Sequence, residues 1–206
     1  PVKGSGRPRT IWLTAVATGQ YRQLTFSAKS DSSARWAPDG RSIAFLSDRD
    51  GAAQLYRLPM AGGEAERLTD GKQKVEAFRW APDGKRIALL MTEPKPEAQQ
   101  AREKDKDDAR IADKDERFTR VWTLDLASRA LKQLTTARHR IGQIEFTPDG
   151  SRLIAAASAK PDEDQFNEAI FSVDLQDGRF TPIATPRGPM GTMALYIAFT
   201  GPGTYP

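Results

Sequence analysis

The sequence contains no cysteine, a single histidine and no long run of apolar residues. The absence of cysteine excludes disulfides, thiolate zinc sites and cysteine nucleophiles. The longest apolar stretch near the end covers residues 194–199. It is far shorter than the roughly 18 residues that a spanning helix needs, so we expect no membrane span. Pro1 opens the chain in place of an initiator methionine, and no apolar signal region follows, which favours a processed chain or a piece of a longer protein.

The sequence also lacks a large excess of charge of either sign. The 31 basic and 27 acidic residues give a net charge of +4, and no basic stripe interleaved with aromatic residues occurs. We therefore expect no nucleic-acid partner. Hydrophobic residues at 38% and charged residues at 28% are typical of a folded globular chain. The sequence does not distinguish between a cytoplasmic and a periplasmic location.

Motifs that would carry chemistry are missing as well. The one histidine, His139, lies between Arg138 and Arg140, where we expect an ordinary surface loop. No Gly-x-Ser-x-Gly elbow, phosphate-binding loop or calcium-binding loop occurs, and Asp105, Asp107 and Asp108 lack the spacing that calcium needs. We expect no catalytic, cofactor-binding or metal-binding residue in this chain, and no cofactor.

What the sequence does contain is a repeat. The tripeptide Pro-Asp-Gly begins at Pro38, Pro82 and Pro148, each time after an aromatic-containing stretch and before an apolar run. A second block, at residues 11–16, 55–60, 121–126 and 170–175, aligns without gaps. Each copy then turns, at Gly19, Gly63, Arg129 or Gly178, and closes at residues 24–25, 68–69, 134–135 or 183–184. The closing pairs are 44, 66 and 49 residues apart. A period in the forties with several short strands indicates propeller blades.

Local chemistry supports four strands in each repeat. Pro-Asp-Gly favours a tight turn, because proline presets the first corner and glycine accepts a left-handed exit. The apolar runs at residues 43–46, 87–90 and 153–156 do not alternate with polar residues, which predicts second strands buried on both faces. The four tryptophans, Trp12, Trp36, Trp80 and Trp122, recur in two strand columns, and we expect them in the core between blades.

These patterns predict an all-β fold: a partial β-propeller of four-stranded antiparallel blades, with about three complete blades and two part-blades. The complete blades span residues 33–69, 75–135 and 141–184. A half blade covers residues 10–25, and residues 191–200 form a damaged half blade that lacks the Pro-Asp-Gly turn. Because propellers close with roughly four to eight blades, residues 1–206 are expected to be a propeller fragment of a larger protein.

A charged insertion at residues 93–117 widens the second complete blade. Its balanced charge is typical of a solvated excursion, and an alternative is a loop that reaches a partner domain.

The blade sequence at residues 36–51, with residues 54–56 and 62–65, resembles the blades shared by TolB-type proteins and prolyl oligopeptidase-family serine peptidases. Residues 106–113 and 118–128 are similar to a stretch in the acylaminoacyl-peptidase and dipeptidyl-peptidase branch of that family. The resemblance implies an N-terminal propeller followed by an α/β-hydrolase domain that holds the whole catalytic triad. None of that triad maps onto this sequence.

Two functions follow as hypotheses. The first is the non-catalytic propeller portion of a serine peptidase that acts on short peptides or peptide N-termini. Its partners would be the C-terminal α/β-hydrolase domain of the same parent chain and the peptide substrate. The alternative is a TolB-like protein-binding propeller of the cell envelope, and a bare scaffold is a third possibility.

Overall fold

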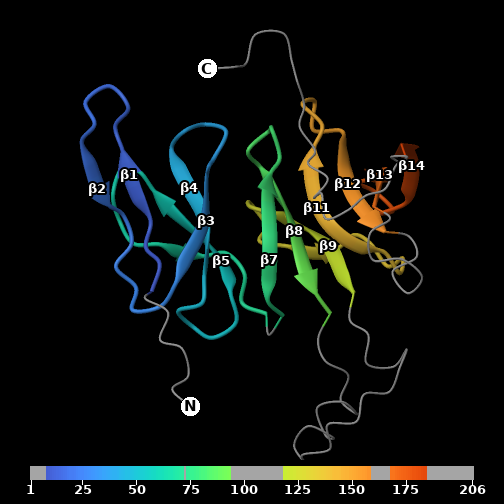
Figure 1. Cartoon of the computed structure of the whole chain (residues 1–206), viewed down its shortest axis with the longest axis horizontal. Coiled ribbons are helices and arrows are strands. Elements are labelled where there is room, and N and C mark those ends of the chain that lie inside the picture. Colours follow the sequence, from blue (N-terminus) through green and yellow to red (C-terminus); the bar gives the residue numbers. More distant parts are fainter. Residues whose placement is uncertain (1–7, 72, 94–117, 159–167, 185–206) are drawn as a thin grey trace, which may run out of the picture. The chain divides into compact units, whose positions relative to one another are not determined.

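The computed structural model describes residues 8–71, 73–93, 118–158 and 168–184 of the chain (Figure 1). The chain forms two compact units, Pro1–Ala77 and Phe78–Pro206. All regular elements in the described ranges are β-strands. No helix with the length and apolar character of a membrane span occurs in them.

The first unit holds a two-stranded and a four-stranded antiparallel sheet. The small sheet pairs β1 (Trp12–Thr14) with β2 (Tyr21–Gln23). The larger sheet has the order β3 (Asp31–Trp36), β4 (Ser42–Ser47), β5 (Gln54–Pro59) and β6 (Glu66–Arg67). Strand β7 (Val75–Trp80) begins in this unit and continues into the second.

The second unit continues the same pattern in two further four-stranded sheets. One has the strands β7, β8 (Arg86–Thr92), β9 (Thr119–Asp125) and β10 (Leu131–Gln133). The other has β11 (Arg140–Phe146), β12 (Arg152–Ser158), β13 (Ala169–Asp174) and β14 (Phe180–Ala184). In every four-stranded sheet, strands that follow one another in sequence are neighbours, as in a propeller blade.

The predicted all-β fold of four-stranded antiparallel blades is confirmed. The three apolar runs form the second strands β4, β8 and β12, and their central residues are buried on both faces. Residues 94–117 of the charged insertion and the predicted half blade at residues 191–200 lie outside the described residues.

The Pro-Asp-Gly turns have the geometry that their residues predict. The amides of Gly40, Gly84 and Gly150 donate to the carbonyl three residues earlier at 2.8–2.9 Å, and these glycines have φ between 65° and 67°. Each turn aspartate accepts a hydrogen bond from the amide two residues later, at 2.9–3.1 Å. In the third turn the Thr147 hydroxyl and the amide and hydroxyl of Ser151 also donate to Asp149, which lowers the pKa of that carboxyl to about 2.

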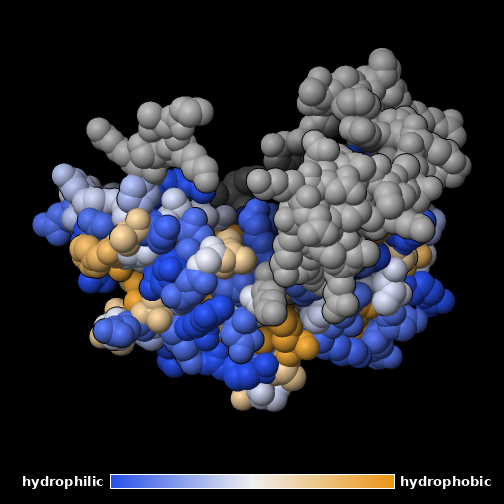
Figure 2. All heavy atoms as spheres, turned by 90° about the horizontal axis from the view of Figure 1, so that it is seen from below, coloured by the Kyte–Doolittle hydropathy of each residue, from blue (hydrophilic) through white to orange (hydrophobic). Residues whose placement is uncertain are grey.

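The expectation that all four tryptophans lie in the core is wrong for two of them. Trp12 and Trp36 are half-exposed, at 53% and 50%. Trp12 lies on a sheet that has only two strands among the described residues, and Trp36 ends the edge strand β3, so neither is covered on both sides. On the face shown in Figure 2, patches of hydrophobic residues lie among hydrophilic ones.

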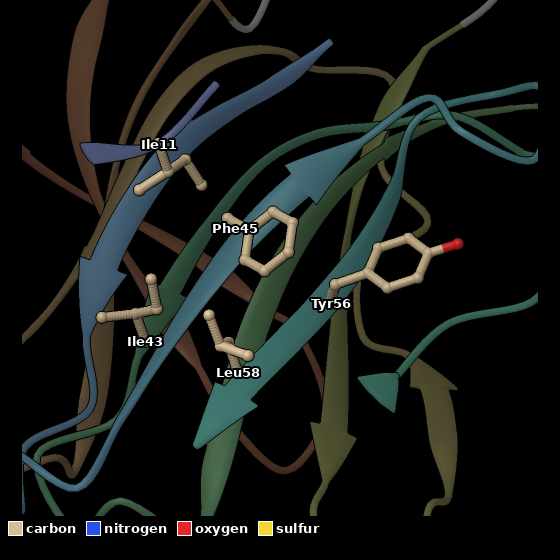
Figure 3. Packing of buried hydrophobic residues seen from close by; sticks show 5 residues of the cluster. All are labelled: Ile11, Ile43, Phe45, Tyr56 and Leu58. Atoms are coloured by element: carbon tan, nitrogen blue, oxygen red, sulfur yellow. The ribbon is translucent and has the colours of Figure 1, made fainter. Parts of the chain in front are cut away.

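The core of the first unit lies between the small sheet and the larger one. Ile11 packs with Ile43, Phe45, Tyr56 and Leu58, as Figure 3 shows. Phe45 and Tyr56 stack with ring centroids 5.9 Å apart. This packing of one sheet on the next is the propeller arrangement that the repeat predicts.

Candidate functional site

A polar cavity of about 550 Å³ lies in the first unit, where β3 and β7 begin and β4 ends. It falls within the range of roughly 300–1,000 Å³ that is usual for ligand pockets. Its lining combines hydroxyl, charged and small side chains: Arg9, Ser30, Ser32, Ser33, Leu46, Asp48, Gly51, Ala52, Ala53, Lys74, Val75 and Glu76.

A β-bulge in β3 shapes one wall of this cavity. The pairing of β3 with β4 shifts register between Ser32 and Arg35, and Ser33 has a φ of 57°. In a regular strand, Ser32 and Ser33 would point to opposite faces of the sheet. Here both line the cavity, because the bulge redirects one of them. A left-handed serine is strained, and such strain is typical of functional positions.

Backbone contacts hold the opening of β3 against the end of β4. The amide of Ser30 donates to Asp48 Oδ1 at 2.7 Å, and the amide of Asp48 donates to the Ser30 carbonyl at 3.3 Å. The Ser30 hydroxyl also accepts from the amide of Arg9 at 3.3 Å. These bonds fix the polar groups before any ligand arrives.

The charged groups around the cavity balance one another. Lys74 Nζ lies 2.6 Å from Glu76 Oε2, and Arg9 and Asp48 add one charge of each sign. A site of this kind suits ligands that both donate and accept hydrogen bonds, such as peptide groups, better than a single strong ion. No group of three or more potential metal ligands occurs in the part of the chain that the structure describes.

His139 belongs to the second unit, where it lies directly before β11. His139 lies in a loop, as the sequence predicts, but its ring is only partly exposed: it stacks on Phe180 at 4.2 Å between centroids and meets the edge of Phe171 at 5.3 Å. Burial, together with the positive charge of Arg120, holds the pKa of His139 below its usual value. Its Nδ1 has no hydrogen-bond partner among the described residues, so it is not paired with a nucleophile there.

Glu93 and Phe118, the described residues on either side of positions 94–117, are hydrogen-bonded to each other. The amide of Glu93 donates to the Phe118 carbonyl at 3.0 Å, and the amide of Phe118 donates to Glu93 Oε2 at 3.3 Å. The buried Arg120 donates from Nε to Glu93 Oε1 at 2.6 Å and from Nη1 to the Ala137 carbonyl. Sequence reasoning missed this clamp, whose one signal is an arginine directly before the apolar pair Val121 and Trp122.

Repeated four-stranded antiparallel sheets with doubly buried second strands define a β-propeller domain. The chain belongs to the TolB beta propeller domain family, whose sequence pattern matches residues 2–115.

Three known proteins are similar to parts of this chain, one in sequence and two in structure. The uncharacterized peptidase YuxL of Bacillus subtilis (strain 168) is 45% identical over 53 residues, which are 25% of this chain and 8% of YuxL. TolB from Acinetobacter baumannii superposes with a TM-score of 0.61 and 23% identity, over 86% of this chain and 37% of TolB. The acylaminoacyl peptidase of Pyrococcus horikoshii superposes with a TM-score of 0.58 and 16% identity, over 84% of this chain and 27% of the peptidase.

The chain therefore spans less than two fifths of the length of each of these three proteins. The two structural likenesses concern the fold. They include both groups whose blades the sequence resembles, TolB-type proteins and peptidases.

Proposed function

We propose that this chain is the non-catalytic propeller portion of a serine peptidase acting on short peptides or peptide N-termini. In this proposal it controls access to an α/β-hydrolase domain that follows it in the parent chain. The 45% identity over 53 residues to a peptidase is the observation that carries the proposal. The three four-stranded sheets would be its complete blades, and β1 with β2 a part-blade.

Catalysis in this proposal belongs to the other domain. Acyl transfer needs a nucleophile, a base that takes its proton and donors for the oxyanion, all held together. The chain has one histidine and no cysteine, and that histidine stacks between phenylalanine rings with no hydrogen-bonded hydroxyl among the described residues. Its role is therefore selection of substrates.

The polar cavity gives this selection a physical basis. Ser32 and Ser33 both line it, and the paired Lys74 and Glu76, also among its lining residues, offer a donor and an acceptor. An extended peptide presents alternating N–H and C=O groups, which such a lining satisfies. The cavity would then hold a peptide segment on its way to the hydrolase domain.

The alternative is a TolB-like protein-binding propeller, and the TM-score of 0.61 with TolB supports it. This function needs no hydrolase domain. The two proposals therefore differ in whether the parent protein hydrolyses peptides.

The test uses the full-length parent and chain 1–206 side by side, with acyl-aminoacyl and dipeptidyl chromogenic substrates. We expect turnover by the parent, loss of that turnover after treatment with a serine-directed covalent inhibitor, and none by the chain alone. An inert parent that the inhibitor does not label would favour the binding propeller. Turnover by the chain alone that is lost on His139→Ala would overturn the non-catalytic role.

A further inference from the structure

A second pocket, of about 410 Å³, lies in the first unit and is distinct from the polar cavity. The segment after β2 forms one side, and β5 with the β5–β6 turn forms the other. Leu24, Leu58 and Ala65 give it apolar walls, and the exposed Phe26 and Glu64 lie among its lining residues. Among the described residues that line it, Arg49 is the one basic residue.

Arg49 is held firmly in place. Its guanidinium carbon lies 4.6 Å from the ring centroid of Tyr56 and 5.5 Å from that of Phe45. Nε donates to Ser47 Oγ at 2.8 Å, and Nη2 donates to Asp31 Oδ1 at 3.1 Å. Asp31 is itself buried, with 2% of its surface exposed. Ring stacking and two hydrogen bonds therefore orient the guanidinium in advance, which reduces the entropy lost when a ligand binds.

The fixed guanidinium keeps unused donors. A guanidinium has five N–H groups, and the bonds to Ser47 and Asp31 use two of them. Within the described residues, no further hydrogen bond of the Arg49 side chain occurs, and its side chain is 27% exposed. Nη1 takes part in neither bond, so its two N–H groups remain as donors that a carboxylate can accept.

The surrounding charges narrow the class of ligand. Asp31 already offsets the charge of Arg49, and Glu64 adds a negative charge among the lining residues. This local charge repels a dianion such as a phosphate monoester more strongly than a monoanion, and a single carboxylate can still use the directional donors of Arg49. The apolar walls require that this carboxylate be attached to an apolar group.

We propose that this pocket binds a carboxylate that carries a small apolar substituent, through the unused donors of Arg49. Two sources supply this chemistry: the C-terminus of a peptide that ends in an apolar residue, and a free aliphatic carboxylic acid. The proposal does not rest on the peptidase role, because the polar cavity and the hydrolase domain play no part in it.

The test is a titration of chain 1–206 followed by ¹⁵N NMR at the amides of Leu24 and Ala65. N-acetyl-leucine is the probe, and N-acetyl-leucinamide is its neutral match. We expect the acid to bind at least about tenfold more tightly than the amide, because a hydrogen bond to a charged group contributes more than a neutral one. Equal affinities for the two would overturn the proposal.

Three variants of the pocket test the role of each group. Arg49→Lys keeps the charge that pairs with Asp31 but loses the fork, and we expect about tenfold weaker binding of the acid. Phe26→Ala and Glu64→Gln change exposed side chains, so the fold is retained. We expect the first to weaken binding about threefold, and the second to strengthen it about twofold. Unchanged affinity in Arg49→Lys would overturn the proposal.

A final arm identifies the source of the carboxylate. 4-Methylpentanoate has the same isobutyl group and carboxylate as N-acetyl-leucine but no peptide group. Comparable affinity supports a site for free aliphatic acids, and an affinity at least about tenfold lower supports a peptide C-terminus. Failure of both acids to shift the two amides would overturn the site itself.

Discussion

Gly178 occupies the turn between β13 and β14, where it has a φ of 71°. A Cβ at this position would lie 1.8 Å from the carbonyl oxygen of Leu134 and 2.7 Å from its carbonyl carbon. The contact is with backbone, so a flexible side chain cannot relieve it. Glycine is therefore required here for space as well as for conformation.

We expect Gly178→Ala to lower the free energy of unfolding by about 2–5 kcal/mol. About 1–2 kcal/mol comes from the left-handed conformation, and about 1–3 kcal/mol comes from the displaced backbone. The matched control is Gly19→Ala, at the same place in the first repeat, with a φ of 67° and nothing within 4 Å of a Cβ. Urea unfolding of both variants measures the difference. Equal losses of unfolding free energy would show that the contact of the new Cβ with Leu134 does not destabilise the fold.

Protonation of His139 gives the second prediction. Because its pKa is lower in the folded chain than in the unfolded chain, the unfolded chain binds more protons as the pH falls. Stability is therefore complete above the ordinary histidine pKa near 6.5 and declines as the pH falls through that value. The chain has one histidine, so this residue dominates the interval between pH 7.5 and pH 5.5.

We expect the free energy of unfolding to fall between pH 7.5 and pH 5.5 in the native chain and to stay level in His139→Phe. The phenylalanine keeps the stacking on Phe180 but cannot bind a proton. Urea unfolding at three pH values measures this slope. An identical slope in both proteins would mean that the partly buried ring does not resist protonation.

At the scale of the strand, a buried threonine closes three of the four repeats. Its hydroxyl accepts a hydrogen bond from the first residue of the second block: Ile11 to Thr25 at 3.0 Å, Leu55 to Thr69 at 2.9 Å and Val121 to Thr135 at 3.0 Å. The residue before each threonine donates to the carbonyl of the same partner at 2.8 Å. The fourth repeat has Ala184 at this place, which pairs with Ile170 through the backbone.

Thr69 tests this closure most sharply, because its hydroxyl also donates to Gln54 Oε1 at 2.7 Å. We expect Thr69→Val to lower the free energy of unfolding by about 2–4 kcal/mol, since the Leu55 amide and the Gln54 oxygen lose their partner in a buried place. Thr181→Val, on the exposed β14, is the control and should change stability by less than about 0.5 kcal/mol. Similar losses of unfolding free energy in both variants would show that the Thr69 hydrogen bonds contribute no more to stability than an exposed threonine does.

The same strands show what a sequence can and cannot predict. Pro38, Pro82 and Pro148 and the apolar runs after them locate turns and second strands, because turn geometry and double burial follow from residue type and spacing alone. The bulge at Ser33 leaves no such signal, since a serine at positive φ depends on the pairing of β3 with β4. The exposure of Trp12 and Trp36 depends on which neighbouring strands are present, and a repeated column does not contain that information.

The candidate sites were harder to predict for the same reason. Both pockets are formed by segments distant in sequence, such as Arg9 with Lys74 and Leu24 with Arg49. The orientation of Arg49 depends on Asp31, eighteen residues earlier, and on two aromatic rings. Residues 48–51 form a turn closed by a hydrogen bond from the Gly51 amide to the Asp48 carbonyl at 3.1 Å, but the sequence of a turn does not place Arg49 in a pocket.

At the scale of the whole molecule, the proposed function makes the propeller a barrier that a substrate must pass. The barrier then depends on how firmly its blades hold together, and local opening becomes a route for larger substrates. Gly178→Ala loosens a turn against Leu134 within the propeller, and in this proposal catalysis belongs to the other domain. The variant is therefore expected to separate access from catalysis.

In the full-length parent, we expect Gly178→Ala to leave kcat/KM for a dipeptidyl chromogenic substrate unchanged and to raise it about threefold or more for an unfolded peptide of roughly 30 residues. Gly19→Ala, the milder change, should shift the ratio of the two values less, in the same direction. The short substrate passes the intact propeller already, so opening a blade adds nothing for it. If both substrates changed by the same factor, the propeller would be acting on the catalytic centre itself, and the gating role would have to be abandoned.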